Sequence, residues 1–321
     1  CGEALVRSLV HGQRYFERVR EGSPSRVLWL PDVFGYSVCL PQLMQLAGIP
    51  YFSTTKLSWS SVTRFPYDTF VWRGHDGSEV LVHFTGLNYK MQCEPGLYAR
   101  LNRTYRQRNV HNEVLRSEGI GDGGGGPSEE GCERARRMKN LTQVPRTSWG
   151  SIEAFFARVE QKRAHLPIFD GELYLELHQG TFTTQSRFKY AYRAAERALQ
   201  AYEAVRVLTG KTTINPALWE RLCTAQFHDA LPGTSIRRVY AEMTPELETM
   251  HTDVWQQLQK DLADTEAETV PSVINTTPQR RYAVAELPGD VLENDTNAAL
   301  QDRLQHAESN GETTLLARVK L

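Results

Sequence analysis

The fold is decided by the stretch RVLWLPDVFGYS, residues 26–37. Its apolar run predicts a short buried strand that ends before Pro31 and Asp32. Helical spacing of apolar residues predicts a helix before it, over 3–20, and another after it, over 39–48, with a further strand from Ile49. This order is typical of an α/β fold with a parallel sheet. Asp32 is thus expected at the carboxyl end of a strand, where such folds carry functional residues.

Farther along, the pattern changes from mixed to helical and then to strands. A strand is predicted over 79–84, helices over 128–140 and 151–165 (with Ser151 as N-cap), and an alternating strand over 171–178. Long helices are predicted over 186–208, 216–228 and 250–267, and short strands over 272–275, 282–287 and 313–321. The sequence pattern therefore predicts an α/β domain, followed by a helical bundle and then by the start of a β domain.

The composition excludes several classes of protein. With 321 residues the chain is long enough for two or three domains. Its 37 basic and 38 acidic residues leave a net charge of -1, so no nucleic-acid partner is expected. No apolar run approaches the length of a transmembrane helix. Five widely spaced cysteines without a CxxC pair predict reduced thiols in a cytoplasm-like compartment, and a chain that starts with Cys1 is expected to be an internal fragment.

Asp32 is the first candidate for chemistry. Trp29, Phe34 and Tyr36 surround it with aromatic surface, which suits the apolar faces of sugars. A carboxylate fixed behind a strand and a proline is suited to act as a nucleophile or a metal ligand. An Asp that caps the following helix explains the same residues, so both interpretations stay open.

Glu172 and Glu176 lie on one face of the predicted strand over 171–178, with His178. At strand spacing these two carboxylates are about 13 Å apart. Retaining glycosidases need two carboxylates about 5–5.5 Å apart, so one of the two would have to pair with Asp32 from another strand. An exposed acidic face is the alternative.

Two further segments contain candidate functional residues. His228 and Asp229 stand together before a loop with proline and glycine, where they suit a metal and a hydroxyl, although a lone His is more often structural. Asp122 lies in the glycine-rich stretch 121–126, which lacks the phosphate-binding pattern. It could contact a hydroxyl, or the stretch could be a flexible connector.

Six segments, taken in order, carry a family resemblance. They are VLWLPDVFGYS (27–37), KLSW (56–59), RFP with DTF and WRG (64–74), GDGGGGP (121–127), GELYLELHQGT (171–181) and FHDALPGTS (227–235). Together they resemble glycoside hydrolase family 38, the class II α-mannosidases, most closely the cytosolic/vacuolar and bacterial branch. The resemblance covers about residues 2–290.

The resemblance implies an incomplete α/β barrel of the seven-stranded type over 1–182, a three-helix bundle over 183–268 and the start of a β-sandwich over 269–321. It implies hydrolysis of terminal α-mannosides with retention of configuration, through a covalent glycosyl-enzyme intermediate. Asp32 matches the nucleophile and a metal ligand, His228 matches a metal ligand, and Asp229 matches a sugar contact. Glu176 is favoured as the acid/base and Glu172 comes second; that group must stay protonated near neutral pH, so partial burial is expected.

The implied metal is zinc, but its shell is incomplete in this sequence. The family supplies two more ligands from a His-x-Asp motif, and none occurs before Asp32. An inactive, truncated sugar-binding fragment is therefore the alternative to an active enzyme, and a different metal hydrolase such as a deacetylase is a third hypothesis. The expected partner is an α-mannoside or oligomannose glycan, in the cytoplasm and away from membranes. A homo-oligomer stays open, because members of this branch are often oligomeric.

Overall fold

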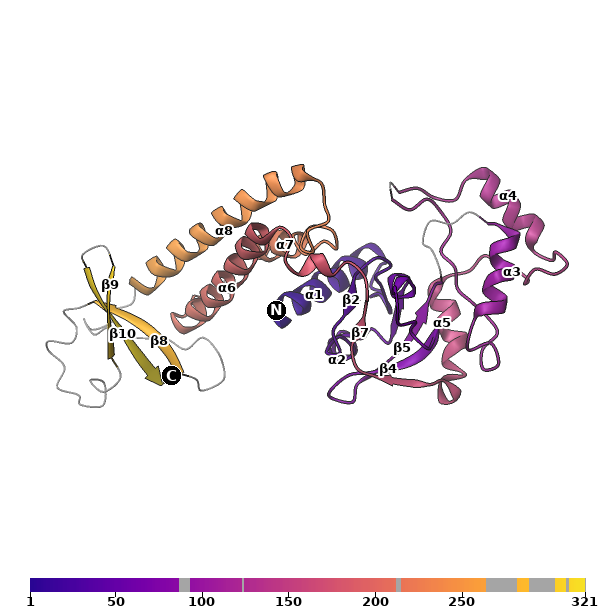
Figure 1. The fold of residues 1–321 in the computed structure, drawn as a ribbon, viewed down its shortest axis with the longest axis horizontal. Helices are drawn as coiled ribbons and strands as arrows, with labels where there is room; N and C mark the ends of the chain where they lie inside the picture. Colours follow the sequence, from indigo (N-terminus) through magenta and orange to yellow (C-terminus); the bar gives the residue numbers. More distant parts are fainter. Residues whose placement is uncertain are drawn as a thin grey trace. The chain divides into compact units, whose positions relative to one another are not determined.

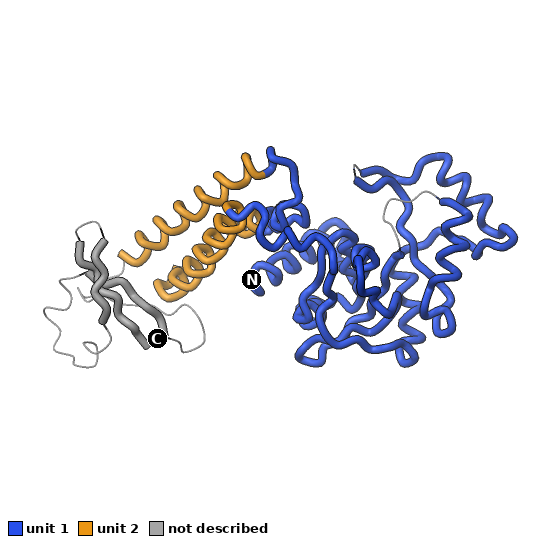
Figure 2. The backbone as a smooth tube through the Cα atoms, in the orientation of Figure 1, with its two compact units in different colours: residues 1–186, 223–239 blue, residues 187–222, 240–321 orange. Residues whose placement is uncertain are grey.

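A computed structural model describes residues 1–86, 93–122, 124–211 and 215–263, and the backbone alone of 282–288, 304–309 and 312–320. The chain divides into two compact units, residues 1–186 with 223–239 and residues 187–222 with 240–321 (Figure 2). Asp32, His228 and Asp229 all belong to the first unit.

Helices and strands are both present along the described chain. The helices are α1 (Gly2–Val19), α2 (Leu40–Leu46), α3 (Pro95–Thr104), α4 (Glu129–Met138), α5 (Ile152–Glu160), α6 (Ser186–Leu208), α7 (Pro216–Thr224) and α8 (Arg237–Ala263). Short 3-10 helices are η1 (Lys56–Trp59), η2 (Arg163–His165) and η3 (Gln179–Phe182). The strands are β1 (Val27–Trp29), β2 (Gly35–Tyr36), β3 (Tyr51–Thr54), β4 (Thr69–Arg73), β5 (Glu79–Phe84), β6 (Ile168–Asp170), β7 (Leu173–Tyr174), β8 (Tyr282–Pro288), β9 (Leu304–Ser309) and β10 (Glu312–Lys320).

The main sheet of the first unit has five strands in the order β1-β3-β5-β4-β6. Figure 1 labels its strands β4 and β5. β3 is parallel to β1 and β5, β6 is parallel to β4, and β4 pairs with β5 in the antiparallel sense. This mostly parallel sheet confirms the predicted α/β class. The finer division into barrel, bundle and sandwich stays a prediction.

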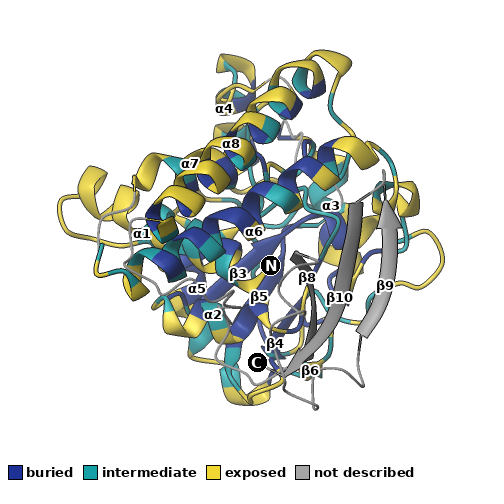
Figure 3. Ribbon diagram, turned by 90° about the vertical axis from the view of Figure 1, so that its left-hand side faces the viewer, coloured by how far each residue is buried: buried dark blue, intermediate teal, exposed yellow. Residues whose placement is uncertain are grey.

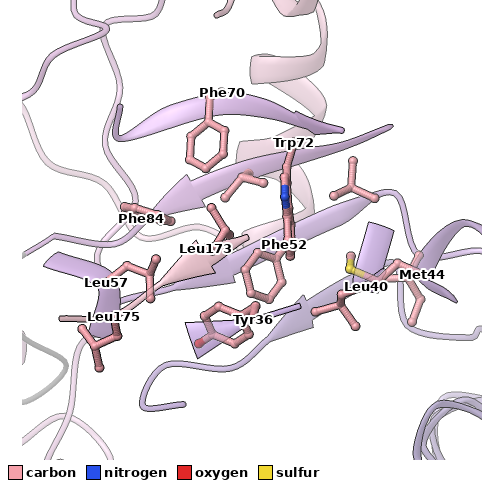
Figure 4. Close-up of a cluster of buried hydrophobic side chains, with 13 residues drawn as sticks. Tyr36, Leu40, Met44, Phe52, Leu57, Phe70, Trp72, Phe84, Leu173 and Leu175 are labelled. Carbon is pink, nitrogen blue, oxygen red and sulfur yellow. The ribbon is translucent and has the colours of Figure 1, made fainter. Parts of the chain in front are cut away.

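Apolar side chains cover both faces of this sheet, because successive strand residues point to opposite faces. Within β5, Val80, Val82 and Phe84 join one buried cluster, drawn in Figure 4, and Leu81 joins the other. The second cluster is completed by α5 through Phe155, Phe156 and Val159. The burial of β3 and β5 is visible as dark blue strands in Figure 3. Coverage on both faces is typical of parallel sheets and explains why β5 carries apolar residues on both of its faces.

The second unit contains nearly all of α6 and most of α7 and α8. Arg187 of α6 pairs with Glu248 of α8 at 2.9 Å, and Arg206 pairs with Asp261 at 3.0 Å. Because both contacts advance along α6 and α8 together, the two helices run in the same direction.

Most predicted elements of the first 211 residues are confirmed within a few residues. The strand over 79–84 and the helix over 186–208 are found with the predicted bounds. Ser151 caps α5, since its hydroxyl accepts a hydrogen bond from the Ala154 N–H at 3.1 Å. No helix in the described ranges is both long enough and apolar enough to cross a membrane.

Three predictions of local structure were wrong or incomplete, and some elements were not predicted. The strand over 171–178 is reduced to Leu173–Tyr174, because its partner β2 is only two residues long and the backbone turns at His178, where φ is 60°. The helix expected over 216–228 ends at Thr224, and the one expected from Met250 begins at Arg237 and continues through Pro245. α3, β4 and β6 were not predicted. The strand expected over 272–275 lies outside the described residues.

Candidate active site

Asp32 lies at the carboxyl edge of the sheet and faces a lysine from the neighbouring strand. The Lys56 ammonium is 2.7 Å from Asp32 Oδ1, and 17% of the Asp32 side chain is exposed. The strand register explains the pairing: Trp29 of β1 aligns with Ser53 of β3, and each charged residue follows three positions later. Backbone hydrogen bonds, including one of 3.0 Å from the Lys56 N–H to the Pro31 carbonyl, extend the alignment beyond the strands.

Lys56 is a residue of the site to which the sequence reasoning gave no role. It is almost fully buried, with 5% of its side chain exposed. Its ammonium lies 4.3 Å from the centre of the Trp59 ring and 5.1 Å from that of Phe34, so two aromatic faces and one carboxylate surround the charge. The sequence feature that could have indicated Lys56 is its position just after a buried strand, at the same edge of the sheet as Asp32.

The loop 227–235 brings His228 and Asp229 to the site. The Asp229 carbonyl accepts hydrogen bonds from the N–H groups of Thr234 at 3.0 Å and Ser235 at 2.9 Å, and its Oδ1 accepts one from the Thr234 hydroxyl at 2.6 Å. Gly233 has a φ of 97°, and a Cβ there would lie 2.3 Å from Thr184 Cγ2. A glycine is therefore required by both backbone conformation and space.

The spacing of donor atoms suits a shared metal ion. His228 Nε2 lies 3.5 Å from Asp32 Oδ2 and 3.5 Å from Asp229 Oδ2. Donors bound to zinc at roughly 2.0–2.2 Å in a tetrahedral shell lie about 3.4 Å from one another. Asp32 and His228 therefore fit as two ligands. In the part of the chain that is described, however, no group of three or more His, Cys, Asp and Glu residues is placed to hold a metal.

The three predicted aromatic residues have different surroundings. Phe34 borders the site, since its ring faces Lys56 and lies 4.9 Å from the His178 ring. Trp29 is half exposed at the end of β1. Tyr36 is buried in the core, and its hydroxyl donates to the Leu30 carbonyl at 2.7 Å. Burial raises the pKa of Tyr36. Its predicted role in sugar binding does not fit this position; it supports the loop that carries Asp32.

Glu176 has surroundings opposite to those expected of a general acid. Its carboxylate accepts hydrogen bonds from the N–H groups of Val62, at 3.3 Å, and Thr63, and from the Thr63 hydroxyl at 2.9 Å. The backbone hydrogen bond from Thr63, followed by its hydroxyl, lowers the pKa of Glu176, because these donors stabilise the ionised form. Glu172 is exposed.

Asp122 lies in a tight turn of the glycine-rich loop. Its backbone is left-handed, with a φ of 53°, and the Ile120 N–H donates to the Gly125 carbonyl at 3.0 Å. A Cβ on Gly119, whose φ is 137°, would lie 2.7 Å from that carbonyl oxygen. The glycines therefore close the turn, and contact of Asp122 with a hydroxyl stays a prediction.

With this geometry established, comparisons with known proteins decide the family. The family model of the glycosyl hydrolases family 38 N-terminal domain matches residues 1–187, and the alpha mannosidase middle domain matches 176–264. The chain belongs to glycosyl hydrolase family 38. The family resemblance of the six sequence segments is thereby confirmed.

Relatives within family 38 are similar over most of the chain. Alpha-mannosidase 2C1 of Homo sapiens is 38% identical over 302 residues, which are 89% of this chain and 29% of that protein. Alpha-mannosidase G of Dictyostelium discoideum is 37% identical over 75% of the chain and 23% of its own length, and the alpha-mannosidase of Saccharomyces cerevisiae is 37% identical over 74% and 24%. The chain thus spans about a quarter of the length of these curated relatives.

Two crystal structures share the fold. An alpha-mannosidase from Enterococcus faecalis V583 superposes with a TM-score of 0.64 at 15% identity, over 99% of this chain and 44% of that one. A family 38 protein from Enterococcus faecalis superposes with a TM-score of 0.56 at 14% identity, over 99% and 41%. At these identities the likeness supports the fold alone.

Proposed function

We propose that this chain carries part of the active site of a retaining α-mannosidase in which Asp32 is the nucleophile. The observation that carries the proposal is the placement of the Asp32 carboxylate, largely buried at the carboxyl edge of the sheet, between Lys56 and His228. Membership of family 38 and relatives named alpha-mannosidases supply the substrate class.

The geometry around Asp32 suits attack on an anomeric carbon. Lys56 holds Oδ1 and fixes the rotation of the carboxylate, while Oδ2 is directed to the side of His228. An ionised, oriented carboxylate beside a bound sugar forms a covalent glycosyl-enzyme intermediate, which water then hydrolyses with overall retention. Phe34 and the half-exposed Trp29 provide apolar faces at this edge, and Asp229 and Asp122 are proposed to contact sugar hydroxyls.

Asp32 Oδ2 and His228 Nε2 are the donors that would hold a zinc ion. Such an ion, when bound, polarises sugar hydroxyls and orients the ring as a Lewis acid. His228 is held for this role by the hydrogen-bonded loop that begins at Phe227 and by its neighbour Asp229. The two donors form part of a shell, so further ligands are needed.

A retaining reaction also requires a second carboxylic acid to protonate the leaving group. The sequence favoured Glu176 and then Glu172 for this acid/base. The hydrogen bonds to Glu176 lower its pKa and oppose that role, whereas Glu172 is exposed and has no such donors among the described residues. Glu172 is then the remaining candidate within this segment, but its exposure does not provide the partial burial expected of an acid/base residue. The expected substrate is a terminal α-mannoside of an oligomannose glycan, and a cytoplasmic location stays a prediction.

The test is to identify the residue that becomes glycosylated. The full-length protein that contains this chain is assayed with an aryl α-mannoside, and the anomer released is observed by NMR. A fluorinated mannosyl donor that traps the intermediate should label the peptide that contains Asp32. Release of the inverted anomer, or a label on another carboxylate, would exclude the proposed mechanism.

A sugar-binding protein without turnover is the second candidate. This candidate is favoured because no group of three or more metal-binding side chains is found among the described residues. Calorimetric titration with mannose and metal analysis of the same protein separate the two functions. Mannose binding without stoichiometric zinc and without release of aryl alcohol would support the second candidate.

A further inference from the structure

A single residue, Glu176, fastens the exposed loop that follows Lys56 and Trp59. The loop 60–63 forms no helix or strand. The Glu176 carbonyl accepts hydrogen bonds from the Ser61 N–H at 3.2 Å and from the Ser61 hydroxyl at 2.6 Å. Its carboxylate accepts three more, from Val62 and Thr63. One residue thus binds three consecutive residues of the loop.

The segment that carries Glu176 is itself attached to the loop that carries Asp32. Leu173 and Tyr174 pair with Tyr36 and Gly35, and Gly35 is required there because a Cβ at its φ of 122° would lie 3.3 Å from the Leu173 carbonyl. Two residues beyond Glu176, His178 packs against Phe34. Glu176 therefore bridges the segment behind Asp32 and the segment that carries Lys56.

We propose that Glu176 is a positioning residue, a carboxylate clamp that holds the 56–63 segment so that Lys56 and Trp59 stay beside Asp32. The backbone N–H groups of Val62 and Thr63 are donors that cannot rotate away, so they hold an ionised carboxylate in one place. The Lys56 ammonium, by contrast, sits on a flexible stem and depends on Trp59 and Phe34 for its position. The clamp acts on the reaction through Lys56 and does not touch the sugar.

The clamp and the acid/base hypothesis for Glu176 predict different kinetics. An acid/base residue matters most for sugars with poor leaving groups, and its loss is relieved by good leaving groups and by an external nucleophile such as azide. A clamp changes the position of Lys56 before either step. Its loss should therefore lower kcat/KM by the same factor for all leaving groups and leave the limbs of the pH profile in place.

Glu176→Gln is the informative variant, with Glu172→Gln as its matched control in the same segment. Hydrogen exchange measured by NMR or mass spectrometry should become several-fold faster at Val62 and Thr63 in Glu176→Gln and stay unchanged in Glu172→Gln. Unchanged exchange at both amides would overturn the clamp, as would a loss of activity confined to poor leaving groups and rescued by azide.

A second pair of variants covers the case in which Glu176→Gln does not fold. Thr63→Val removes one donor to the carboxylate, and Thr63→Ser retains it. Faster exchange and lower kcat/KM in Thr63→Val, both restored in Thr63→Ser, are expected; equal behaviour of the two variants would contradict the clamp. The kinetic part rests on the proposed α-mannosidase function. If the protein hydrolyses no mannoside, that function fails, while the exchange rates still decide whether Glu176 fastens the loop.

Discussion

Asp32 and Glu176 are both carboxylates that follow apolar stretches, but they are bound by different kinds of groups. Asp32 faces two side chains, Lys56 at 2.7 Å and His228 at 3.5 Å, which come from separate parts of the first unit. Glu176 accepts hydrogen bonds from two consecutive backbone N–H groups and one hydroxyl of a single loop.

The difference indicates which carboxylate is available for chemistry. Backbone donors are fixed by the chain, so a carboxylate that they bind is held as an ionised structural group. Side-chain partners can shift when a ligand arrives, and a 3.5 Å separation from an imidazole nitrogen is long for a hydrogen bond but suitable for two ligands of one metal. This criterion favours our proposals that Asp32 is the reactive group and Glu176 the supporting one.

The largest expected effect is on turnover in Asp32→Asn. Loss of the nucleophile should lower kcat by at least about 1,000-fold, with the fold retained because the amide is nearly isosteric. Steady-state kinetics of the full-length protein with an aryl α-mannoside, together with its circular dichroism spectrum, measure this. Glu176→Gln should lose far less activity, and the reverse order would show that the comparison assigns the two carboxylates wrongly.

The next largest effect is expected in Lys56→Met, which removes the cation beside Asp32 and keeps a side chain of similar length. A charge-assisted hydrogen bond contributes roughly 1.5–3 kcal/mol, so kcat should fall about 10- to 100-fold. The thermal midpoint should also fall, because a largely buried carboxylate loses its counter-charge.

A double-mutant cycle separates this ion pair from other effects of Lys56. Adding Lys56→Met to Asp32→Asn should lower the thermal midpoint less than Lys56→Met alone, since the amide needs no counter-charge. Equal losses in both backgrounds would show that the aromatic contacts of Lys56, rather than Asp32, determine its contribution.

The sequence was sufficient to predict Asp32 at a strand end, because an apolar run that stops at Pro31 is a local signal. It was also sufficient for α1, β5 and α6, where apolar spacing is regular. The sequence did not allow the Lys56–Asp32 pair to be predicted. The pair depends on the register of β1 against β3, which no local pattern encodes. The family resemblance named Lys56 within a motif but gave it no role.

The segment 171–178 shows why alternation alone misleads. Leu173 and Leu175 are buried as a strand pattern requires, yet pairing needs a partner, and β2 offers only two residues. The hydrogen bonds of Glu176 to loop 60–63 connect residues more than 110 positions apart, so its role depends on tertiary structure. Tyr36 shows the same limit, since this aromatic residue lies near Asp32 in sequence but packs into the core.

Gly233→Ala tests the second partner of Asp32 by distorting the loop that carries His228. A Cβ at a φ of 97° and 2.3 Å from Thr184 should destabilise the protein by roughly 1–3 kcal/mol. It should also weaken zinc binding and turnover, because His228 shifts from Asp32 Oδ2. Gly180→Ala is the control, since a Cβ there meets nothing within 4 Å. Equal thermal midpoints for the two variants would show that the loop adapts without displacing His228.

The smallest expected effect is the response of the clamp to acid. The pKa of Glu176 is lowered in the folded chain, so the clamp stabilises at all pH values above the unfolded pKa of about 4.3 and is lost as the pH falls through the lower folded value. The chemical shift of the Thr63 amide, followed from pH 6 downward, should report a titration midpoint below the ordinary pKa of a glutamate while the first unit stays folded. Glu176→Gln should remove the titration and Glu172→Gln should not. A midpoint above the ordinary pKa of a glutamate would instead show a carboxyl suited to donate a proton, and would restore Glu176 as the acid that partners Asp32.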